Sequence, residues 1–321
     1  MIEPGATLGD LGEFSLIAAI TEGLVLGADV LLGPGDDAAV LAVDGAVATS
    51  VDVLVEGVHF RRDWSSARDV GRKAVAVNVS DLEAMGAQAR GLVVGFSAPP
   101  ELPVDWALEF AAGLAEECAS AGVSLLGGDV TRARDITISV MVLGGFAGRE
   151  PVRRSGARPG DVVAVSGQLG LAAAGWKVLS RGFRSPRAAV ERQRVPQLSY
   201  GAGVVAAEAG ATAMIDVSDG LLADLAHVAT ASGVSLELRS DAFEVVETLR
   251  VVAVATGADP YTMILTGGED HVLAATFTDP AAVPQGWTVV GTVTEPGETP
   301  VLVDGAVWED PGGYDHFRSR R

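Results

Sequence analysis

The sequence predicts a two-domain protein of the α+β class. Its 321 residues exceed the usual length of one domain, and 48% of them are hydrophobic, which is enough for two cores. Segments with a helical period of apolar residues alternate with β-branched runs along the whole chain. Residues 149–160, a basic segment with Pro and Gly, interrupt this alternation near the middle. We therefore expect domains at residues 1–148 and 149–321.

The first half is expected to begin with a helix over residues 13–26. Phe14, Ile17, Ile20 and Leu24 have helical spacing, and the following Gly and Pro break the pattern. Further segments of this half follow the same two patterns. We expect helices at 68–86 and about 103–121, and strands at 40–43, 46–55, 91–98, 123–129 and 135–146.

The second half repeats this mixture of elements. We expect strands at 161–167, 213–218, 234–240, 271–277 and 287–294, and helices at about 168–181, 200–209, 219–233 and 242–256. The two halves share no fixed short period, so a solenoid is excluded.

Composition excludes several classes of protein. The chain has 23 Lys and Arg against 42 Asp and Glu, a net charge of −19, and lacks the clustered cations that bind a nucleic-acid backbone. The N-terminus has no signal-peptide pattern and no stretch reaches about 18 uninterrupted apolar residues, so we expect a cytoplasmic protein without a membrane partner. The single cysteine, Cys118, excludes an internal disulfide and lies in an Ala-rich helical pattern typical of an inert buried thiol.

Five short acidic segments carry the strongest functional signal. They are GDDAAV at 35–40, SVD at 50–52, NVSDLEAMGA at 78–87, GGD at 127–129 and DVSDG at 216–220. Each sets an Asp beside Gly, Ser or Asn in apolar surroundings, where an unpartnered carboxylate is costly. Mg²⁺ takes oxygen ligands and shares carboxylates with substrate phosphates. The sequence therefore predicts a Mg²⁺-dependent phosphoryl-transfer enzyme.

Within the first two segments, three side chains stand out. Asp36 and Asp37 are adjacent like charges, which a cation or backbone amides would neutralise, although a solvated turn explains them equally well. Asp52 interrupts a strand-like run, where Asp is disfavoured unless it binds something. His59 follows seven residues later and is either a substrate contact or a partly buried histidine of the core.

On the expected helix at 68–86, Asn78 and Asp81 are i, i+3 neighbours. An apolar stripe on the opposite side can pack on a sheet, which would place both near Asp37 and Asp52. An exposed polar helix face is the alternative.

The remaining acidic segments suggest a phosphate site. Gly128 before Asp129 allows phosphate to approach the backbone closely. Ser218 or Asp219 can cap the helix that follows, whose N-terminus would accept a phosphate oxygen with Asp216 alongside. In TGGEDHVL, Glu269 and Asp270 follow two glycines, which turn chemistry alone could explain.

Several common catalytic motifs are absent from the sequence. It has no GxxxxGK[ST] phosphate loop and no HRD or DFG kinase signature, and it also lacks GxSxG, CxxC and HExxH. A conventional nucleotide-binding kinase, acyl transfer, thiol redox chemistry and zinc proteolysis are therefore disfavoured.

Taken together, the motifs resemble those of the thiamine-monophosphate kinase family, related to aminoimidazole-ribonucleotide synthetase and selenophosphate synthetase. They run in order from about residue 10 to 317 as GDDAAV, SVDVLVEGVHF, GRKAVAVNVSDLEAMGA, GGDVTR, RRSGARPGD, IDVSDGLLADLAHVA, GGEDHVL and GGYDHF. The resemblance implies an N-terminal α/β domain whose sheet pairs across a homodimer, and a C-terminal α+β domain. It also implies that ATP phosphorylates thiamine monophosphate directly, with no phosphoenzyme and no general base.

The resemblance further implies a set of site residues. Several Mg²⁺ ions would be held by Asp37, Ser50, Val51, Asp52, Asp81, Asp129, Asp216 and Asp219. ATP would contact Gly128, Asp129, Arg154 and Ser218, and thiamine monophosphate would contact His59 and Glu269. Family members can carry an aromatic residue just before the terminal GYDHF; here Pro311 and Gly312 are in that vicinity, which leaves Tyr314 or Trp308 for this contact.

Two other functions remain open from the sequence. One is a different ATP-dependent ligase or synthetase of the same superfamily, although the chain lacks the reactive N-terminal cysteine expected of selenophosphate synthetase and the C-terminal cysteine of the hydrogenase-maturation relative. The other is a non-catalytic acidic protein that binds divalent cations, for which the net charge of −19 would suffice. Turnover that requires both thiamine monophosphate and Mg²⁺ would separate the kinase from such a protein.

Overall fold

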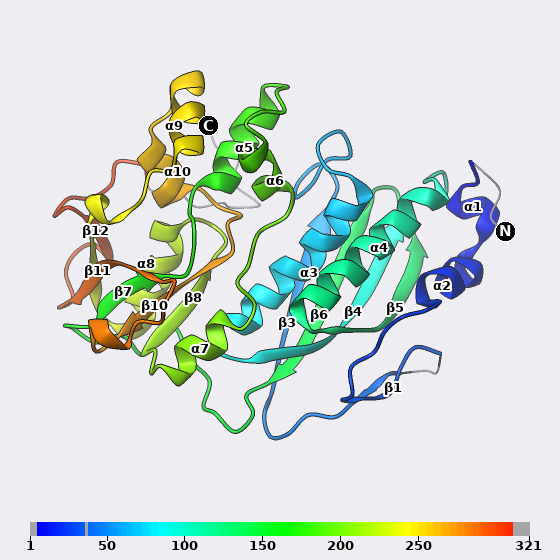
Figure 1. Cartoon of the computed structure of the whole chain (residues 1–321), viewed down its shortest axis with the longest axis horizontal. Helices are drawn as coiled ribbons and strands as arrows, with labels where there is room; N and C mark the ends of the chain where they lie inside the picture. Colours follow the sequence, from blue (N-terminus) through cyan, green and yellow to red (C-terminus); the bar gives the residue numbers. More distant parts are fainter. Residues whose placement is uncertain (1–4, 36–37, 311–321) are drawn as a thin grey trace. The chain divides into compact units, whose positions relative to one another are not determined.

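The structure is a computed structural model that describes residues 5–35 and 38–310 of the chain (Figure 1). It divides into two compact units. The first comprises residues 1–82 and 87–149, and the second comprises residues 83–86 and 150–321. The short segment 83–86 therefore belongs to the second unit although it lies within the first half of the sequence.

The first unit contains a four-stranded sheet in the order β3-β6-β4-β5. Strands β3 and β4 both pair antiparallel with β6, and β4 pairs parallel with β5. The described elements of this unit are α1 (Leu8–Leu11), α2 (Glu13–Thr21), β1 (Val30–Leu32), β2 (Val40–Leu41), β3 (Val47–Val55), α3 (Ala67–Glu83), β4 (Gln88–Ala98), α4 (Val104–Ala121), β5 (Ser124–Arg132) and β6 (Thr137–Gly145).

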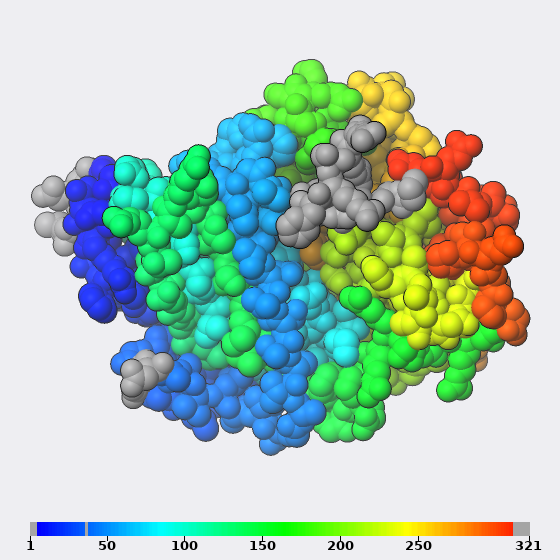
Figure 2. Space-filling view, turned by 180° about the vertical axis from the view of Figure 1, so that it is seen from behind, coloured from blue at the N-terminus to red at the C-terminus, as the bar shows by residue number. Residues whose placement is uncertain are grey.

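Helices α3 and α4 lie over one face of this sheet (Figure 1). Alternation along β3 turns Ser50, Asp52 and Leu54 toward α3, and Leu54 is buried. The other face is partly apolar and exposed. Val47, Val51, Val53 and Met141 are each at least 39% exposed there, and Figure 2 shows the strands of this face at the surface.

The second unit contains a six-stranded sheet in the order β12-β9-β11-β7-β10-β8, in which only the β12–β9 pair is parallel. Every residue of β7, β8 and β10 is buried, because both faces of these strands are covered. The described strands are β7 (Val162–Val165), β8 (Ala213–Val217), β9 (Ser235–Leu238), β10 (Val272–Phe277), β11 (Thr288–Thr294) and β12 (Val301–Val303).

The helices of the second unit include two that no sequence pattern had predicted. They are α5 (Leu171–Ser180), α6 (Arg187–Arg194), α7 (Ala202–Glu208), α8 (Leu221–Ser232), α9 (Glu247–Thr256) and α10 (Pro260–Thr266), with short 3-10 turns at Ser240–Ala242 and Pro280–Ala282. The unpredicted ones, α6 and α10, are only 8 and 7 residues long, too short for a clear apolar period.

Several expected boundaries were wrong for local reasons. The helix expected to reach residue 26 ends at Thr21, two residues before Gly23 with φ 74°. The helix expected from about 242 begins at Glu247, because residues 240–242 form a 3-10 turn. The strand expected from 271 begins at Val272, since His271 has φ 52° and cannot continue an extended strand.

Candidate active site

In the first unit, the polar side of α3 faces β3. Ser50 Oγ donates to Asp81 Oδ2 at 2.6 Å, and the Asp52 amide donates to Asn78 Oδ1 at 3.0 Å. Asn78 is completely buried and its Nδ2 also donates to the carbonyl of Ala74. The expected closeness of Asp52 to Asn78 is therefore confirmed, and Asp81 lies against Ser50 on the same strand. The alternative of an exposed helix face is wrong for Asn78.

His59 lies in the loop after β3 and is held in a defined orientation. Its Nδ1 accepts a hydrogen bond from the Val55 amide at 3.0 Å, so the neutral ring carries its proton on Nε2. The carbonyl of His59 accepts from Nζ of Lys73 at 3.0 Å. Lys73 is only 2% exposed, an unusual burial for a lysine that its position on α3 alone did not reveal.

The structure does not bring Asp129 to the other acidic residues of the first unit. Asp129 pairs with Gly95, Gly95 with Ser139, and Ser139 with Val53, so Asp129 points to the exposed face of the sheet, opposite to Asp52. The strands β5 and β3 are also the two edges of the sheet, roughly 14 Å apart at ordinary strand spacing. The prediction that all these carboxylates converge is thus not met for Asp129 within one copy of the chain.

The structure shows a reason why residue 128 is glycine, and the sequence alone did not show it. A Cβ built on it would lie 2.0 Å from the carbonyl oxygen of Val94 on the neighbouring strand. No side chain fits at this position, because the backbone of β4 already occupies the space. Glycine is therefore needed because the backbone of β4 approaches residue 128 closely, whereas the sequence had suggested the close approach of a phosphate.

In the second unit, three carboxylates gather where β8 leads into α8. Asp216 ends up buried on β8, and Asp224 in the first turn of α8 accepts the amides of Asp219 and Gly220 at 3.1 and 3.0 Å. Burial, together with the charges of Asp216 and Asp219, raises the pKa of Asp224 to about 7. Such a concentration of negative charge is the kind that a bound cation relieves.

The expected helix cap was wrong. Helix α8 begins at Leu221 with Gly220 as its N-cap, and no side chain caps it, so neither Ser218 nor Asp219 does so. Gly220 has φ 121°, a conformation that side chains rarely adopt. Asp224, which sequence reasoning missed, instead binds the amides just before the helix. The signal for it was an acidic residue in the first turn of an otherwise apolar helix.

His271 is a second residue that sequence reasoning missed. Its Nδ1 lies 3.3 Å from Oδ2 of Asp216, and the two side chains are 7% and 8% exposed. His271 precedes β10, which pairs with β8 through Val272 and Val217. The sequence signal was only a histidine directly after the GGED segment.

The TGGED loop lies against the end of β8. The amides of Glu269 and His271 donate to the carbonyls of Ser218 and Val217 at 2.7 and 2.8 Å. Glu269, expected to bind substrate, is therefore joined through its backbone to the DVSDG segment. Asp270 is completely buried, and burial raises its pKa to about 6 even though two backbone amides and the charges of Arg192 and His271 act in the opposite direction.

The structure does not bring the backbone of Arg154 to Ser218. The carbonyl of Arg154 accepts from Ser232 Oγ at the C-terminal end of α8, whereas Ser218 precedes its N-terminal end. A helix of 12 residues spans about 18 Å. Arg154 is exposed. Of the other expected residues, Asp37 and Tyr314 lie outside the described residues, and Trp308 is half-buried.

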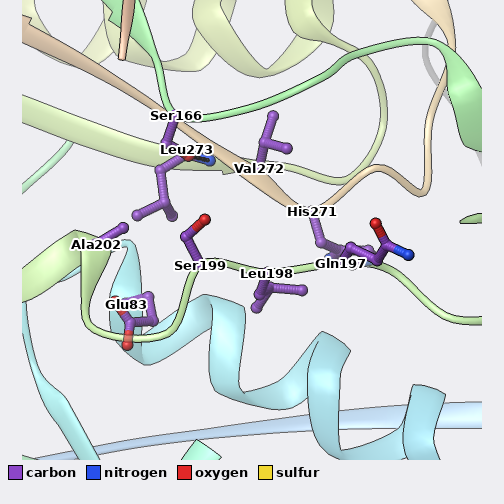
Figure 3. A pocket seen from close by; sticks show the side chains of 9 residues that line it. All are labelled: Glu83, Ser166, Gln197, Leu198, Ser199, Ala202, His271, Val272 and Leu273. Carbon is purple, nitrogen blue, oxygen red and sulfur yellow. Dashed lines mark hydrogen bonds between the residues drawn. The ribbon is translucent and has the colours of Figure 1, made fainter. Parts of the chain in front are cut away.

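One pocket within the second unit is small and has no Lys or Arg in its lining. Glu83, Ser166, Gln197, Leu198, Ser199, Ala202, His271, Val272 and Leu273 line it. Leu273 and Ser199 point toward one another across it (Figure 3). Its carboxylate, Glu83, accepts the amides of Gly201 and Gly203, each at 2.7 Å. These contacts give this pocket no obvious means of binding a phosphate.

The acidic sets fit a magnesium ion by their chemistry. Among the described residues, no three His, Cys, Asp or Glu side chains are arranged to hold one metal ion. Magnesium, however, commonly takes only one or two protein carboxylates and completes its shell with phosphate and water. Ser50 with Asp81, and Asp216 with Asp219, supply only oxygen atoms, which suits this hard cation.

Among the described residues, no helix is both long and apolar enough to cross a membrane.

Both halves of the chain match domains of the same protein family. The AIR synthase related protein family matches residues 35–146 with its N-terminal domain and residues 158–304 with its C-terminal domain. The chain is 47% identical over 313 residues to the thiamine-monophosphate kinase of Mycobacterium tuberculosis, covering 97% of this chain and 93% of that protein.

Solved structures agree with this relationship. The crystal structure of thiamine monophosphate kinase from Aquifex aeolicus matches with a TM-score of 0.77 and 32% identity, covering 94% of this chain and 99% of the other. The structure of AaThiL complexed with AMPPCP and TMP matches with a TM-score of 0.76 and 32% identity, covering 98% and 100%. The two-domain mixed α/β fold is thus shared with solved thiamine-monophosphate kinases, and the chain belongs to the thiamine-monophosphate kinase family of phosphotransferases.

Proposed function

We propose that this chain transfers the γ-phosphoryl group of ATP directly to the phosphate of thiamine monophosphate, with Mg²⁺ as cofactor. The names of its relatives support the substrates, as does the related structure that is complexed with AMPPCP and TMP. The observation that carries the proposal is the joining of the DVSDG and TGGED segments. Backbone hydrogen bonds from Glu269 and His271 to Ser218 and Val217 join the TGGED loop to the segment that carries Asp216 and Asp219.

The residues divide into three proposed roles. Asp37, Ser50, the backbone of Val51, Asp52, Asp81, Asp129, Asp216 and Asp219 would hold magnesium. Gly128, Arg154 and Ser218 would bind ATP together with Asp129, and His59, Glu269 and Tyr314 would bind thiamine monophosphate. Magnesium, when bound, would neutralise the phosphate charges that otherwise repel each other.

The reaction needs few catalytic groups from the protein. A phosphate oxygen of thiamine monophosphate forms the new bond to the γ-phosphorus as the bond to the ADP oxygen breaks, and ADP leaves with that electron pair. The attacking oxygen is already ionised, so we assign no general base. The side chains would orient the two phosphates in line, and the carboxylates would do so through the magnesium that they share with the phosphates. The use of ATP is consistent with action in the cytoplasm.

We propose a homodimer formed through the exposed face of the first unit's sheet. Val47, Val51, Val53 and Met141 expose 39–58% of their surface on this face. Such an apolar face is costly in water, and a second copy offers a matching surface with the same twist. Asp129 also points to this face, so dimer formation would change its surroundings.

A coupled assay tests the function. Purified protein is mixed with ATP, thiamine monophosphate and Mg²⁺, and both ADP and thiamine diphosphate are quantified. We expect the two products in equal amounts, with neither formed when thiamine monophosphate or Mg²⁺ is left out. Release of inorganic phosphate without thiamine diphosphate would favour a ligase of the same superfamily. Cation binding without any ADP would favour a non-catalytic acidic protein.

A further inference from the structure

Asp270 links the TGGED loop to a distant helix. It is 0% exposed, and its two carboxylate oxygens accept the backbone amides of Gly170 at 2.5 Å and Ala172 at 3.0 Å. These amides belong to the N-terminal turn of α5. Gly170 precedes Asp270 by 100 residues in the chain. The N-cap of α5 is a glycine and has no side chain for capping, so Asp270 satisfies these amides from the loop.

The two neighbours of Asp270 have unusual backbone conformations. Glu269 has φ 70° and His271 has φ 52°, and among the described residues only Ala147 and Asp304 are other non-glycine residues with positive φ. Side chains disfavour this region, so surrounding contacts must maintain it. The end of β8 binds the amides of Glu269 and His271, while α5 binds the Asp270 side chain between them.

Close packing leaves the loop little room to relax. A Cβ on Gly267 would lie 2.2 Å from the Met263 carbonyl oxygen, and one on Gly268 would lie 2.6 Å from that of Ser218. The glycines therefore allow the loop backbone to touch α10 and the DVSDG segment directly. The Glu269 amide is held by Ser218 and the next residue, Asp270, is held by α5. The loop backbone therefore fixes the direction in which the Glu269 side chain leaves it.

We propose that Asp270 is a positioning residue, which fixes Glu269 in its left-handed conformation and so aims the Glu269 carboxylate at thiamine monophosphate. This inference rests on the proposed function. Asp270 itself is buried and touches α5, so it acts through its neighbour. The backbone of Asp216 is held separately, by the strand pairing with Leu273. Loss of the Asp270 anchor should thus weaken the use of thiamine monophosphate more than that of ATP.

Steady-state kinetics of Asp270→Asn test this proposal. Asn keeps the size of the side chain but replaces one accepting oxygen with a donor, which cannot bind an amide N–H. We expect KM for thiamine monophosphate to rise at least about tenfold, because small misplacements of a binding group are costly. KM for ATP should change less than about twofold.

Asp161→Asn is the matched control. Asp161 is also a buried carboxylate of the second unit that accepts a backbone amide, that of Arg158 at 3.0 Å, and a hydroxyl, that of Thr212 at 2.7 Å. It lies at the opposite end of β10, where Val162 pairs with Phe277. We expect lower thermal stability in this variant but an unchanged KM for thiamine monophosphate. An equal rise of this KM in both variants would overturn the positioning role.

A double-mutant cycle with Glu269→Gln separates positioning from general structural damage. If Asp270 acts through Glu269, adding Asp270→Asn to Glu269→Gln should raise KM for thiamine monophosphate less than about twofold further. Fully additive effects in the cycle would contradict the proposal.

A measurement on the wild type requires no variant. Binding of thiamine monophosphate should slow hydrogen exchange at the amides of Gly170 and Ala172, since coupling between the loop and the anchor is reciprocal. The Arg158 amide, bound by Asp161, should not respond. Unchanged exchange at Gly170 and Ala172 would overturn the proposal.

Failure of this inference can be told from failure of the proposed function. A wild type that makes no thiamine diphosphate would refute the proposed function. An active wild type, together with an Asp270→Asn variant whose KM for thiamine monophosphate is normal, would refute only this inference.

Discussion

His271 Nδ1 lies 3.3 Å from Oδ2 of Asp216, and both side chains are buried. This contact joins the residue before β10 to the first residue of the acidic DVSDG segment, which lies on β8. It orients a carboxylate that we assign to magnesium binding. Partners of this kind restrict the rotation of a ligand and thereby strengthen the site.

We expect His271→Phe to weaken magnesium binding. Phe retains an aromatic ring of similar breadth but has no polar atom for Asp216. The Mg²⁺ concentration that gives half-maximal activity should rise about tenfold. Magnesium titrations at saturating ATP and thiamine monophosphate measure this. His227→Phe is the control, since His227 is exposed on α8, and an equal rise in both variants would argue against the assigned role.

We expect Asp81→Ala to reduce turnover severely while the fold stays nearly intact. Asp81 accepts the Ser50 hydroxyl at 2.6 Å and is assigned to magnesium, so its loss removes a carboxylate from the proposed phosphate site. The fall in kcat should be at least about 100-fold, the size seen when one stabilising group is removed from a catalytic site. Asp69→Asn on the same helix, whose carboxylate accepts the Ser66 amide and has no role in the proposed site, is the control. Near-normal turnover of Asp81→Ala refutes the assignment.

The stability of the protein should depend on pH through Asp270. Burial raises the pKa of this carboxyl from its ordinary 3.8 to about 6 in the folded chain. Because the folded-state pKa lies above the unfolded one, its contribution is fully present below about pH 4 and is lost as the pH rises through about 6. The free energy of unfolding of the wild type should therefore fall relative to that of Asp270→Asn, by at most about 3 kcal/mol between pH 4 and pH 7. Urea unfolding across this range measures it, and the opposite slope would contradict the assignment.

The exposed sheet face predicts the effect of a charge on association. Met141 is 39% exposed at the middle of β6, so Met141→Asp would bury a carboxylate in the proposed dimer interface. We expect this variant to sediment as a monomer at concentrations where the wild type is a dimer. Val254→Asp on α9, 87% exposed in the second unit, should leave the dimer unchanged. A wild type that sediments as a monomer would remove the basis for the proposed interface.

The elements that the sequence predicted best are those with long, clear periods. The strand at 46–55 and the helix at 68–86 were expected almost as they occur, as β3 and α3, because their apolar residues repeat with the period of the element. The closeness of Asp52 to Asn78 was expected from the same patterns, although the sequence had placed the opposite, apolar stripe of the helix against the sheet, whereas Asn78 and Asp81 themselves contact β3.

The acidic motifs and their order also indicated the family, which the comparisons confirm. Carboxylates set between Gly, Ser and apolar residues suit a hard cation that is shared with phosphates, so the residue types alone indicated phosphoryl transfer. No pattern along the chain, however, states which of these residues share a face of the sheet. The placement of Asp129 opposite to Asp52 depends on strand order and on the pairing through β6 and β4.

Contacts between distant segments were decided by the tertiary structure alone. The His271–Asp216 contact spans 55 residues and the bond from Asp270 to Gly170 spans 100. Local propensities act over only a few residues. These contacts form because β10 pairs with both β7 and β8, which brings the segments next to these strands together. The sequence by itself thus indicated the family and the residue types of the proposed site, and the packing of β8, β10 and α5 decided which of these side chains contact one another.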